Sequence, residues 1–187
     1  MINILYYDGN DKTKQTIVKE ILDTFPCTYQ LLETKDLSQT IGYLMQLDGF
    51  LQTEETKQPC FYHDLMILHD LDDTTISTIS NALQKAQVPV ARKAMLTKHN
   101  QTWTLSALLQ EIEEEHQYFL CYDQLKQLLL DVNTMEETAY TAASWKEYQT
   151  AFLQGYLLFQ EQQPNKALLE KAIQNILHTK AILQASK

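Results

Sequence analysis

The strongest constraint on the fold is an alternation of short apolar segments with amphipathic segments through residues 1–119. Short apolar segments that contain β-branched and aromatic residues are typical of strands. Between them, apolar residues recur every three or four positions, as on helices with one buried face. The four predicted strands are Ile2–Tyr7, Thr28–Leu32, Tyr62–Leu68 and Val90–Thr97.

Capping residues and prolines mark where the intervening helices begin and end. Asn10 or Asp11 can cap a first helix that ends before Pro26, and Asp72 or Asp73 can cap a later helix that ends before Pro89. A short helix is predicted over Leu37–Leu47, and a long helix is predicted to begin near Thr104. The polar segment Asp48–Pro59 lacks periodicity and is predicted to be an exposed loop.

This order of elements predicts an α/β fold with a small, mainly parallel four-stranded sheet flanked by helices. Strands that alternate with helices favour crossover connections, which place successive strands parallel. A mixed sheet with one reversed edge strand is the alternative.

The C-terminal region predicts a second, helical domain. Two stripes at helical spacing flank a turn at Pro164. Together with the end of the long helix they predict an antiparallel three-helix bundle, which gives an α/β domain at 1–119 and a helical domain at 120–187, joined through the long helix. The aromatic stripe could bind sugars, but a small bundle needs these rings for its core. The stripes are Trp145, Tyr148, Phe152, Tyr156 and Phe159, then Leu169, Ile173, Ile176, Lys180 and Leu183.

Charge and composition argue against several classes of function. The net charge of -9, with Arg92 as the single arginine, is unfavourable for binding phosphate backbones, so we expect no nucleic-acid partner. No apolar segment is long enough to cross a membrane, and Met1–Asp8 does not resemble a signal peptide, so we expect no membrane partner and a cytoplasmic location. The three cysteines lie far apart and outside any metal-binding spacing.

Glycine is too sparse for a nucleotide-binding loop. The four glycines are isolated, and neither GxGxxG nor GxxxxGK[ST] occurs in the chain. We therefore expect no cofactor.

The candidate site residues follow the predicted strands. In a parallel sheet the carboxyl ends of the strands form the usual ligand site. His69 and His99 could then act as acid and base, with Asp8 or Asp70 orienting one of them, or they could hold a divalent metal. Polar residues that cap and turn the chain are the simpler explanation, and we assign no catalytic or metal-ligating residue. The candidate ligand-binding residues are Asp8, His69, Asp70, Lys98, His99 and Asn100.

Two segments resemble known families. Residues 92–119, with Thr97, Asn100, Trp103 and the Glu-Glu-His run that ends at His116, resemble an uncharacterised bacterial family, the domain of unknown function DUF3783. We expect this resemblance to extend from Met1 to about Tyr118; it implies no established activity.

The segment Tyr140–Trp145, followed by Tyr148 and Ala151, resembles the three-helix module called FIVAR. Many such modules are spacers or bind carbohydrate or protein in secreted proteins. This resemblance implies a helical bundle after the α/β domain.

We expect a non-catalytic interaction or regulatory protein with a protein partner. The missing cofactor motifs, the acidic composition and the appended helical domain motivate this expectation. The alternative is a small-molecule-binding protein or enzyme with a site at the carboxyl ends of the strands.

Overall fold

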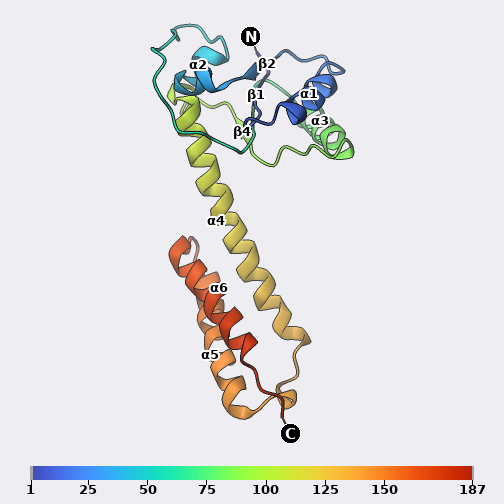
Figure 1. Ribbon diagram of the computed structural model, residues 1–187, viewed down its shortest axis with the longest axis vertical. Coiled ribbons are helices and arrows are strands. Elements are labelled where there is room, and N and C mark those ends of the chain that lie inside the picture. The colour runs from blue at the N-terminus through green and yellow to red at the C-terminus, as the bar shows by residue number, and fades with distance from the viewer. Residues whose placement is uncertain (1, 187) are drawn as a thin grey trace. The chain divides into compact units, whose positions relative to one another are not determined.

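The computed structural model describes residues 2–186. The chain divides into two compact units, Met1–Glu114 and Glu115–Lys187, which we call the first unit and the second unit and describe separately (Figure 1). Helix α4 (Leu105–Asp131) contributes its N-terminal turns to the first unit and its remaining turns to the second.

The first unit contains a four-stranded sheet with the strand order β2–β1–β3–β4. Its strands are β1 (Ile4–Tyr7), β2 (Tyr29–Leu32), β3 (Leu65–Leu68) and β4 (Lys93–Met95). The α/β class is therefore confirmed.

The prediction of a mainly parallel sheet is wrong, because the sheet is mixed. β1 is parallel to β2, and β3 is parallel to β4. The two central strands, β1 and β3, are antiparallel, with Ile4 opposite Leu68 and Tyr7 opposite Leu65. Two parallel pairs thus meet at an antiparallel junction, which also differs from a single reversed edge strand.

The connection between β2 and β3 explains the reversal. The predicted helix over Leu37–Leu47 is instead a 3-10 helix, η1 (Thr34–Ser38), and a four-residue helix, α2 (Ile41–Leu44). After α2 the chain turns at Gln46, whose φ is 58°, and returns without further helix or strand as far as Asp64. β3 therefore starts at the edge where β2 ended and runs in the opposite direction.

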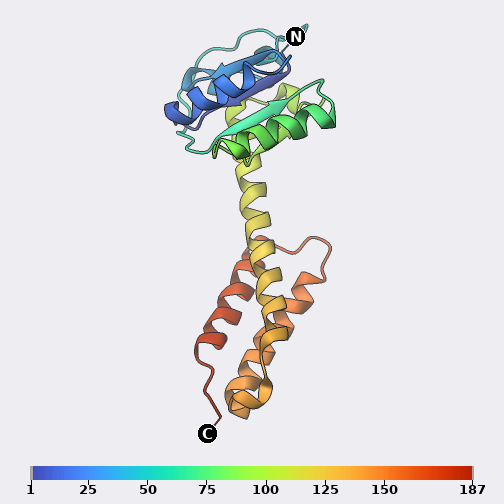
Figure 2. The same ribbon diagram turned by 90° about the vertical axis from the view of Figure 1, so that its right-hand side faces the viewer.

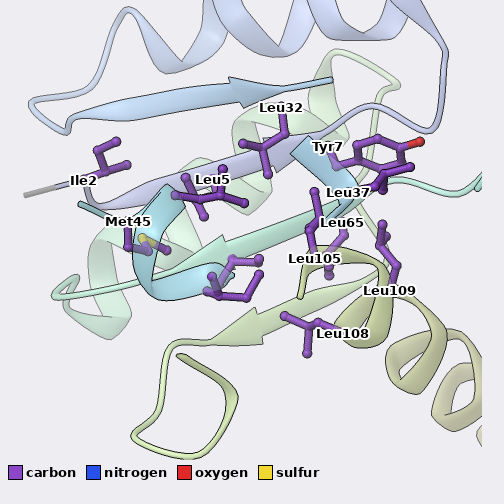
Figure 3. Close-up of a cluster of buried hydrophobic side chains, with 13 residues drawn as sticks. Ile2, Leu5, Tyr7, Leu32, Leu37, Met45, Leu65, Leu105, Leu108 and Leu109 are labelled. Atoms are coloured by element: carbon purple, nitrogen blue, oxygen red, sulfur yellow. The ribbon is translucent and has the colours of Figure 1, made fainter. Parts of the chain in front are cut away.

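Helices cover both faces of the sheet, and each face has its own apolar core. Helices α1 (Lys12–Leu22) and α3 (Asp73–Lys85) lie side by side on one face (Figure 2). Helix α2 and the first turns of α4 cover the other face (Figure 3). Because side chains alternate along a strand, Ile4 and Tyr6 lie in the α1/α3 core, whereas Leu5 and Tyr7 lie in the α2/α4 core.

Carboxylate caps set the beginnings of α1 and α3. Asp11 accepts a hydrogen bond from the Lys14 amide at 2.9 Å, and Asp72 accepts one from the Thr75 amide at 2.8 Å. Each bond satisfies an amide that has no partner within its helix. Of the alternatives in the sequence, Asp11 and Asp72 are thus the caps.

The second unit consists of the rest of α4, α5 (Ala142–Phe159) and α6 (Lys166–Ala181), with short 3-10 helices η3 (Val132–Thr134) and η4 (Glu137–Ala139) before α5. All three α-helices contribute to one core. Its buried residues are Leu125, Leu128, Leu129, Trp145, Tyr148, Ala151, Leu169, Ala172, Ile173 and Ile176.

The aromatic stripe of α5 is only partly a core stripe. Trp145 and Tyr148 are buried, as predicted, whereas Tyr156 is exposed and Gly155 takes the buried position beside it. A Cβ at Gly155 would lie 2.8 Å from Cδ1 of Ile176, so α5 and α6 approach closely there. Among the described residues, no helix is both long and apolar enough to cross a membrane.

Candidate functional site

The mixed sheet divides the predicted strand-end site between two edges. Asp8 follows β1, whereas His69 and Asp70 follow β3. Since Tyr7 pairs with Leu65 at the start of β3, Asp8 and His69 lie at opposite ends of the central strand pair. In this register His69 falls opposite Asn3, five residues from Asp8, so the two lie about 17 Å apart along the strand direction. The expectation of one shared edge fails because it assumed that all strands run in the same direction.

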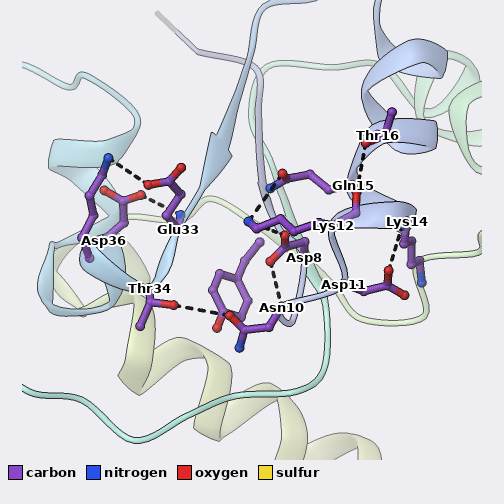
Figure 4. A network of polar contacts seen from close by, with 12 residues as sticks. Asp8, Asn10, Asp11, Lys12, Lys14, Gln15, Thr16, Glu33, Thr34 and Asp36 are labelled. Carbon is purple, nitrogen blue, oxygen red and sulfur yellow. Dashed lines mark hydrogen bonds and ion pairs between the residues drawn. The ribbon is translucent and has the colours of Figure 1, made fainter.

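At the first edge, Asp8 organises the turn between β1 and α1 (Figure 4). Its carboxylate accepts a hydrogen bond from the Asn10 amide at 2.9 Å and forms an ion pair with Lys12 at 2.7 Å. Asn10 also donates from its side chain to the carbonyl of Phe61 at 3.1 Å. Asp8 is therefore a buried residue with identified partners, as expected of a group that holds a loop.

Two more residues belong to this edge. Tyr7 is the last residue of β1, and Glu33 is the first residue after β2. The hydrogen bond and positive charge of Lys35 lower the pKa of Glu33, which is exposed. Burial raises the pKa of the Tyr7 hydroxyl, which donates to the carbonyl of Phe61 at 3.2 Å. The Tyr7 bond joins β1 to the segment before β3, whereas the Glu33–Lys35 ion pair lies within the turn after β2.

The second edge gathers the other candidate residues. His69 and Asp70 follow β3, and Lys98 and His99 follow the neighbouring parallel strand β4. The His69 amide donates to the carbonyl of Asn3 at 2.8 Å, and Asp70 has a positive φ of 51°. The ring of His99 lies edge-on to Trp103, with 5.0 Å between ring centroids. The His99 ring therefore packs against the turn that precedes α4.

Asn100 holds the turn between β4 and α4. Its side-chain oxygen accepts from the Thr97 amide at 2.8 Å, and its side-chain nitrogen donates to the Met95 carbonyl at 2.9 Å. The Asn100 amide donates in turn to the Thr97 hydroxyl at 3.1 Å. These partners are a turn residue and the last residue of β4, so the geometry gives Asn100 a structural role.

The four surface depressions that we describe are lined by residues other than the six candidates. One of them lies beside an ion pair between Arg92 and Glu113, whose Nε and Oε2 atoms are 2.6 Å apart. Nδ1 of His63 lies 3.7 Å from the same carboxylate oxygen. Within residues 2–186, no group of three or more His, Cys, Asp or Glu side chains is arranged to hold a metal ion.

The second unit carries exposed apolar side chains on two of its helices. Leu153 and Leu157 of α5 are 51% and 67% exposed, and Leu168 of α6 is 50% exposed. Most soluble surfaces scatter such residues singly, and a contiguous apolar patch indicates a binding surface. Here Leu157 and Leu168 line one depression between α5 and α6.

We call this depression the α5/α6 groove. Half of its lining residues are apolar and half are polar, with one charge of each sign, from Glu161 and Lys171. Protein-binding surfaces commonly combine apolar and polar residues in this way. The lining residues are Gln154, Leu157, Leu158, Glu161, Leu168, Lys171, Ala172 and Asn175.

The sequence indicates this surface through apolar residues of α5 that lie outside the predicted aromatic stripe. The stripe accounts for one face of α5, yet Leu153, Leu157 and Leu158 fall outside it. A helix with apolar residues around most of its circumference needs a second apolar neighbour in addition to its own core.

Comparison with known families supports part of the predicted resemblance. Residues 64–119 match a family described as "Domain of unknown function (DUF3783)". The match runs from the start of β3 into α4, so the expectation that it begins at Met1 is wrong, and β1, β2 and α1 lie outside it. Neither the curated proteins nor the solved structures compared with the chain gave a match.

Proposed function

We propose that the protein is a non-catalytic interaction protein of the bacterial cytoplasm whose second unit binds a helix of a partner protein. The observation that carries this proposal is the α5/α6 groove, where Leu157 and Leu168 expose apolar area to solvent. The match to a domain of unknown function is compatible with this role and does not favour a catalytic one.

The chemistry of the α5/α6 groove suits an amphipathic helix. A groove between two helices receives a third helix whose apolar residues recur at positions i, i+3, i+4 and i+7. The charges of Glu161 and Lys171, which line the groove, would pair with a basic and an acidic residue beside that apolar stripe. The partner is therefore a helix with a narrow apolar face and flanking charges of both signs.

The overall charge favours a protein partner over nucleic acid or a lipid surface. At a net charge of -9, the chain repels polyanions, including phosphate backbones and anionic lipids. The first unit would then serve as the folded support from which the second unit is presented.

We further propose that the second unit is an antiparallel three-helix bundle of the FIVAR type, beginning near residue 120. Its single core from α4, α5 and α6 supports a bundle. Thr141 caps α5, and its hydroxyl lies 2.9 Å from that of Ser144, within the segment that carries the resemblance.

A ligand site at the strand ends is the alternative function. It rests on His69, Asp70, Lys98 and His99 at the second edge, with Asn100 in the adjoining turn and Asp8 at the other edge. The contacts of Asp8 and Asn100 are accounted for by the turns that they hold, which favours the interaction role.

Capture of partners from the native host tests the proposal. The full chain is used as bait beside Leu157→Ser with Leu168→Ser, which makes the groove polar. The control is Leu51→Ser, since Leu51 is 82% exposed but lies in the first unit. We expect the control to retain the captured protein and the double variant to lose it.

The captured protein must also bind through a helix. A synthetic peptide covering its most amphipathic helix should compete for the bait, and a peptide with its apolar residues replaced by Ser should not. Retention of the same partner by the double variant would place the binding surface elsewhere. Because both leucines are at least half exposed, their replacement should change the free energy of unfolding by only about 0.5 kcal/mol.

A further inference from the structure

The two halves of the first unit repeat one order of elements. The first half runs β1–α1–β2–η1–α2, and the second runs β3–α3–β4–η2–α4, where η2 is the 3-10 turn Asn100–Thr102. Helices α1 and α3 cover the same face of the sheet, and α2 and α4 cover the other. Both halves therefore build their layers in the same order and on the same sides.

The strand registers of the two halves also correspond. Ile4 pairs with Tyr29 in the first half as Met66 pairs with Lys93 in the second. Ile4 and Met66 lie in the α1/α3 core, so the correspondence preserves the face as well as the register. In the central pair Ile4 lies opposite Leu68 and Tyr6 lies opposite Met66. Exchanging the two halves leaves this pairing unchanged, as a two-fold axis between β1 and β3 requires.

The turns after β2 and β4 form the same reciprocal hydrogen bonds from different residues. In the first half the Glu33 amide donates to Asp36 at 2.8 Å, and the Glu33 side chain accepts from the Asp36 amide. In the second half the Thr97 amide donates to Asn100 at 2.8 Å, and the Thr97 hydroxyl accepts from the Asn100 amide.

Thr40 and Thr104 lie where the axis must pass. They are opposite each other in an isolated antiparallel bridge. The Ile41 amide donates to the Trp103 carbonyl, and the Leu105 amide donates to the Gln39 carbonyl, both at 2.9 Å. Each threonine also caps the helix that follows it, through the amides of Tyr43 and Ala107. A residue that faces its own counterpart lies on a two-fold axis.

We infer that the first unit consists of two copies of one module, residues 4–45 and 66–109, which pair as a two-fold dimer within a single chain. The second copy lies inside the matched domain, and the first copy lies outside it. The partner surface of the second copy is thus the edge of β3 that pairs with β1, together with the turn at Thr104, and its partner is the first copy.

The copies differ where the chain must connect them. Helix α4 continues beyond Leu109, whereas α2 stops at Leu44 and the chain turns at Gln46. Phe50 folds back over the shortened helix at Gly42, where a Cβ would lie 2.5 Å from the Phe50 ring. Shortening of the helix frees the segment that leads back to β3.

A disulfide on the axis tests the relation between the copies. In the full chain with Cys27, Cys60 and Cys121 replaced by Ser, Thr40→Cys is combined with Thr104→Cys. Opposed residues of an antiparallel bridge have Cα atoms about 4.5–5.5 Å apart, within the range that a disulfide spans. We expect mild oxidation to join them in the folded protein, as detected by mass spectrometry of tryptic peptides. The control, Thr40→Cys with Thr102→Cys, should stay reduced; failure of the 40–104 pair to close would overturn the axis.

Exchange of turn residues tests the equivalence of the copies independently. Glu33→Thr with Asp36→Asn gives the first copy the bonding residues of the second. We expect its urea midpoint to match that of the original chain, whereas Glu33→Val with Asp36→Leu, which has no acceptors, should lower it. Equal losses in both variants would show that the two turns are not equivalent and would overturn the duplication.

Discussion

Asp8 and Lys12 form an ion pair at 2.7 Å, although the side chain of Asp8 is 1% exposed and that of Lys12 is 64% exposed. Lys12→Met leaves the buried carboxylate without its charged donor, so we expect the free energy of unfolding to fall by about 1 kcal/mol. The effect is no larger because the Lys12 ammonium group is exposed to solvent. Urea unfolding, followed by Trp103 fluorescence in a Trp145→Phe background, measures the first unit. The matched control is Lys19→Met, since Lys19 and Asp23 have the same spacing but are both exposed. An equal change in the two variants would contradict this prediction.

Trp103 and His99 should differ in their contributions to stability. Trp103 packs against the α2/α4 core while remaining partly exposed. Trp103→Ala should therefore lower the free energy of unfolding by about 3 kcal/mol, which is at the lower end for loss of a large aromatic side chain. His99 is exposed and its ring makes a T-shaped contact with that of Trp103, so His99→Ala should lower the free energy of unfolding by about 0.5 kcal/mol. Urea melts followed by far-UV circular dichroism give both values. Similar values for the two variants would rule out Trp103 as the anchor of this turn.

Gly9 and Gly49 allow backbone strain to be separated from steric overlap. Both have positive φ, 63° at Gly9 and 84° at Gly49. A Cβ at Gly9 would lie 2.8 Å from the backbone of His63, whereas one at Gly49 would have no atom within 4 Å. Gly49→Ala should therefore cost only the strain of about 1–2 kcal/mol, and Gly9→Ala should cost clearly more. Thermal melts compare the two; a larger loss at Gly49 would be incompatible with the packing at Gly9.

Alkaline pH should weaken the fold through buried tyrosines. Burial raises the pKa of Tyr6 above its ordinary value near 10, and the nearby Asp64 raises it further. The contribution to stability is complete below the unfolded pKa of about 10 and is lost as the pH rises above it, because only the unfolded chain ionises there. In Tyr6→Phe, the urea midpoint should fall less steeply as the pH rises above about 10. A direct check is absorbance at alkaline pH, where Tyr6, Tyr7 and Tyr148 should ionise after the exposed tyrosines.

Local pattern predicted the elements of the fold but not their directions. The apolar runs and the caps at Asp11 and Asp72 are local features, and they identified four strands and the helices between them. The direction of β3 depends on whether the chain crosses the sheet or returns to the edge that it left. That choice depends on the turn at Gln46 and on the packing of Phe50 over Gly42. Neither feature can be predicted from hydrophobic periodicity.

The candidate site was limited by the same missing information. Asp8 and His69 each follow a strand, as predicted, but only strand direction decides whether they share an edge. Asn100 was expected at a turn, and its bonds to Thr97 and Met95 tie that turn to the end of β4. Leu157 falls outside the predicted aromatic stripe of α5 and is exposed, but Leu158 also falls outside it and packs against the core, so the stripe alone does not decide exposure.

The central position of β1 also determines how exposed the nascent protein is during synthesis. β1, α1 and β2 leave the ribosome before β3, and they form a parallel pair with one covered face. The second edge of β1 has no strand to pair with until β3 has been made, and an open apolar edge is a template for aggregation between chains. The polar segment Asp48–Pro59 is translated in this interval. It therefore delays the pairing of β1 with β3, and it keeps the incomplete domain in contact with water.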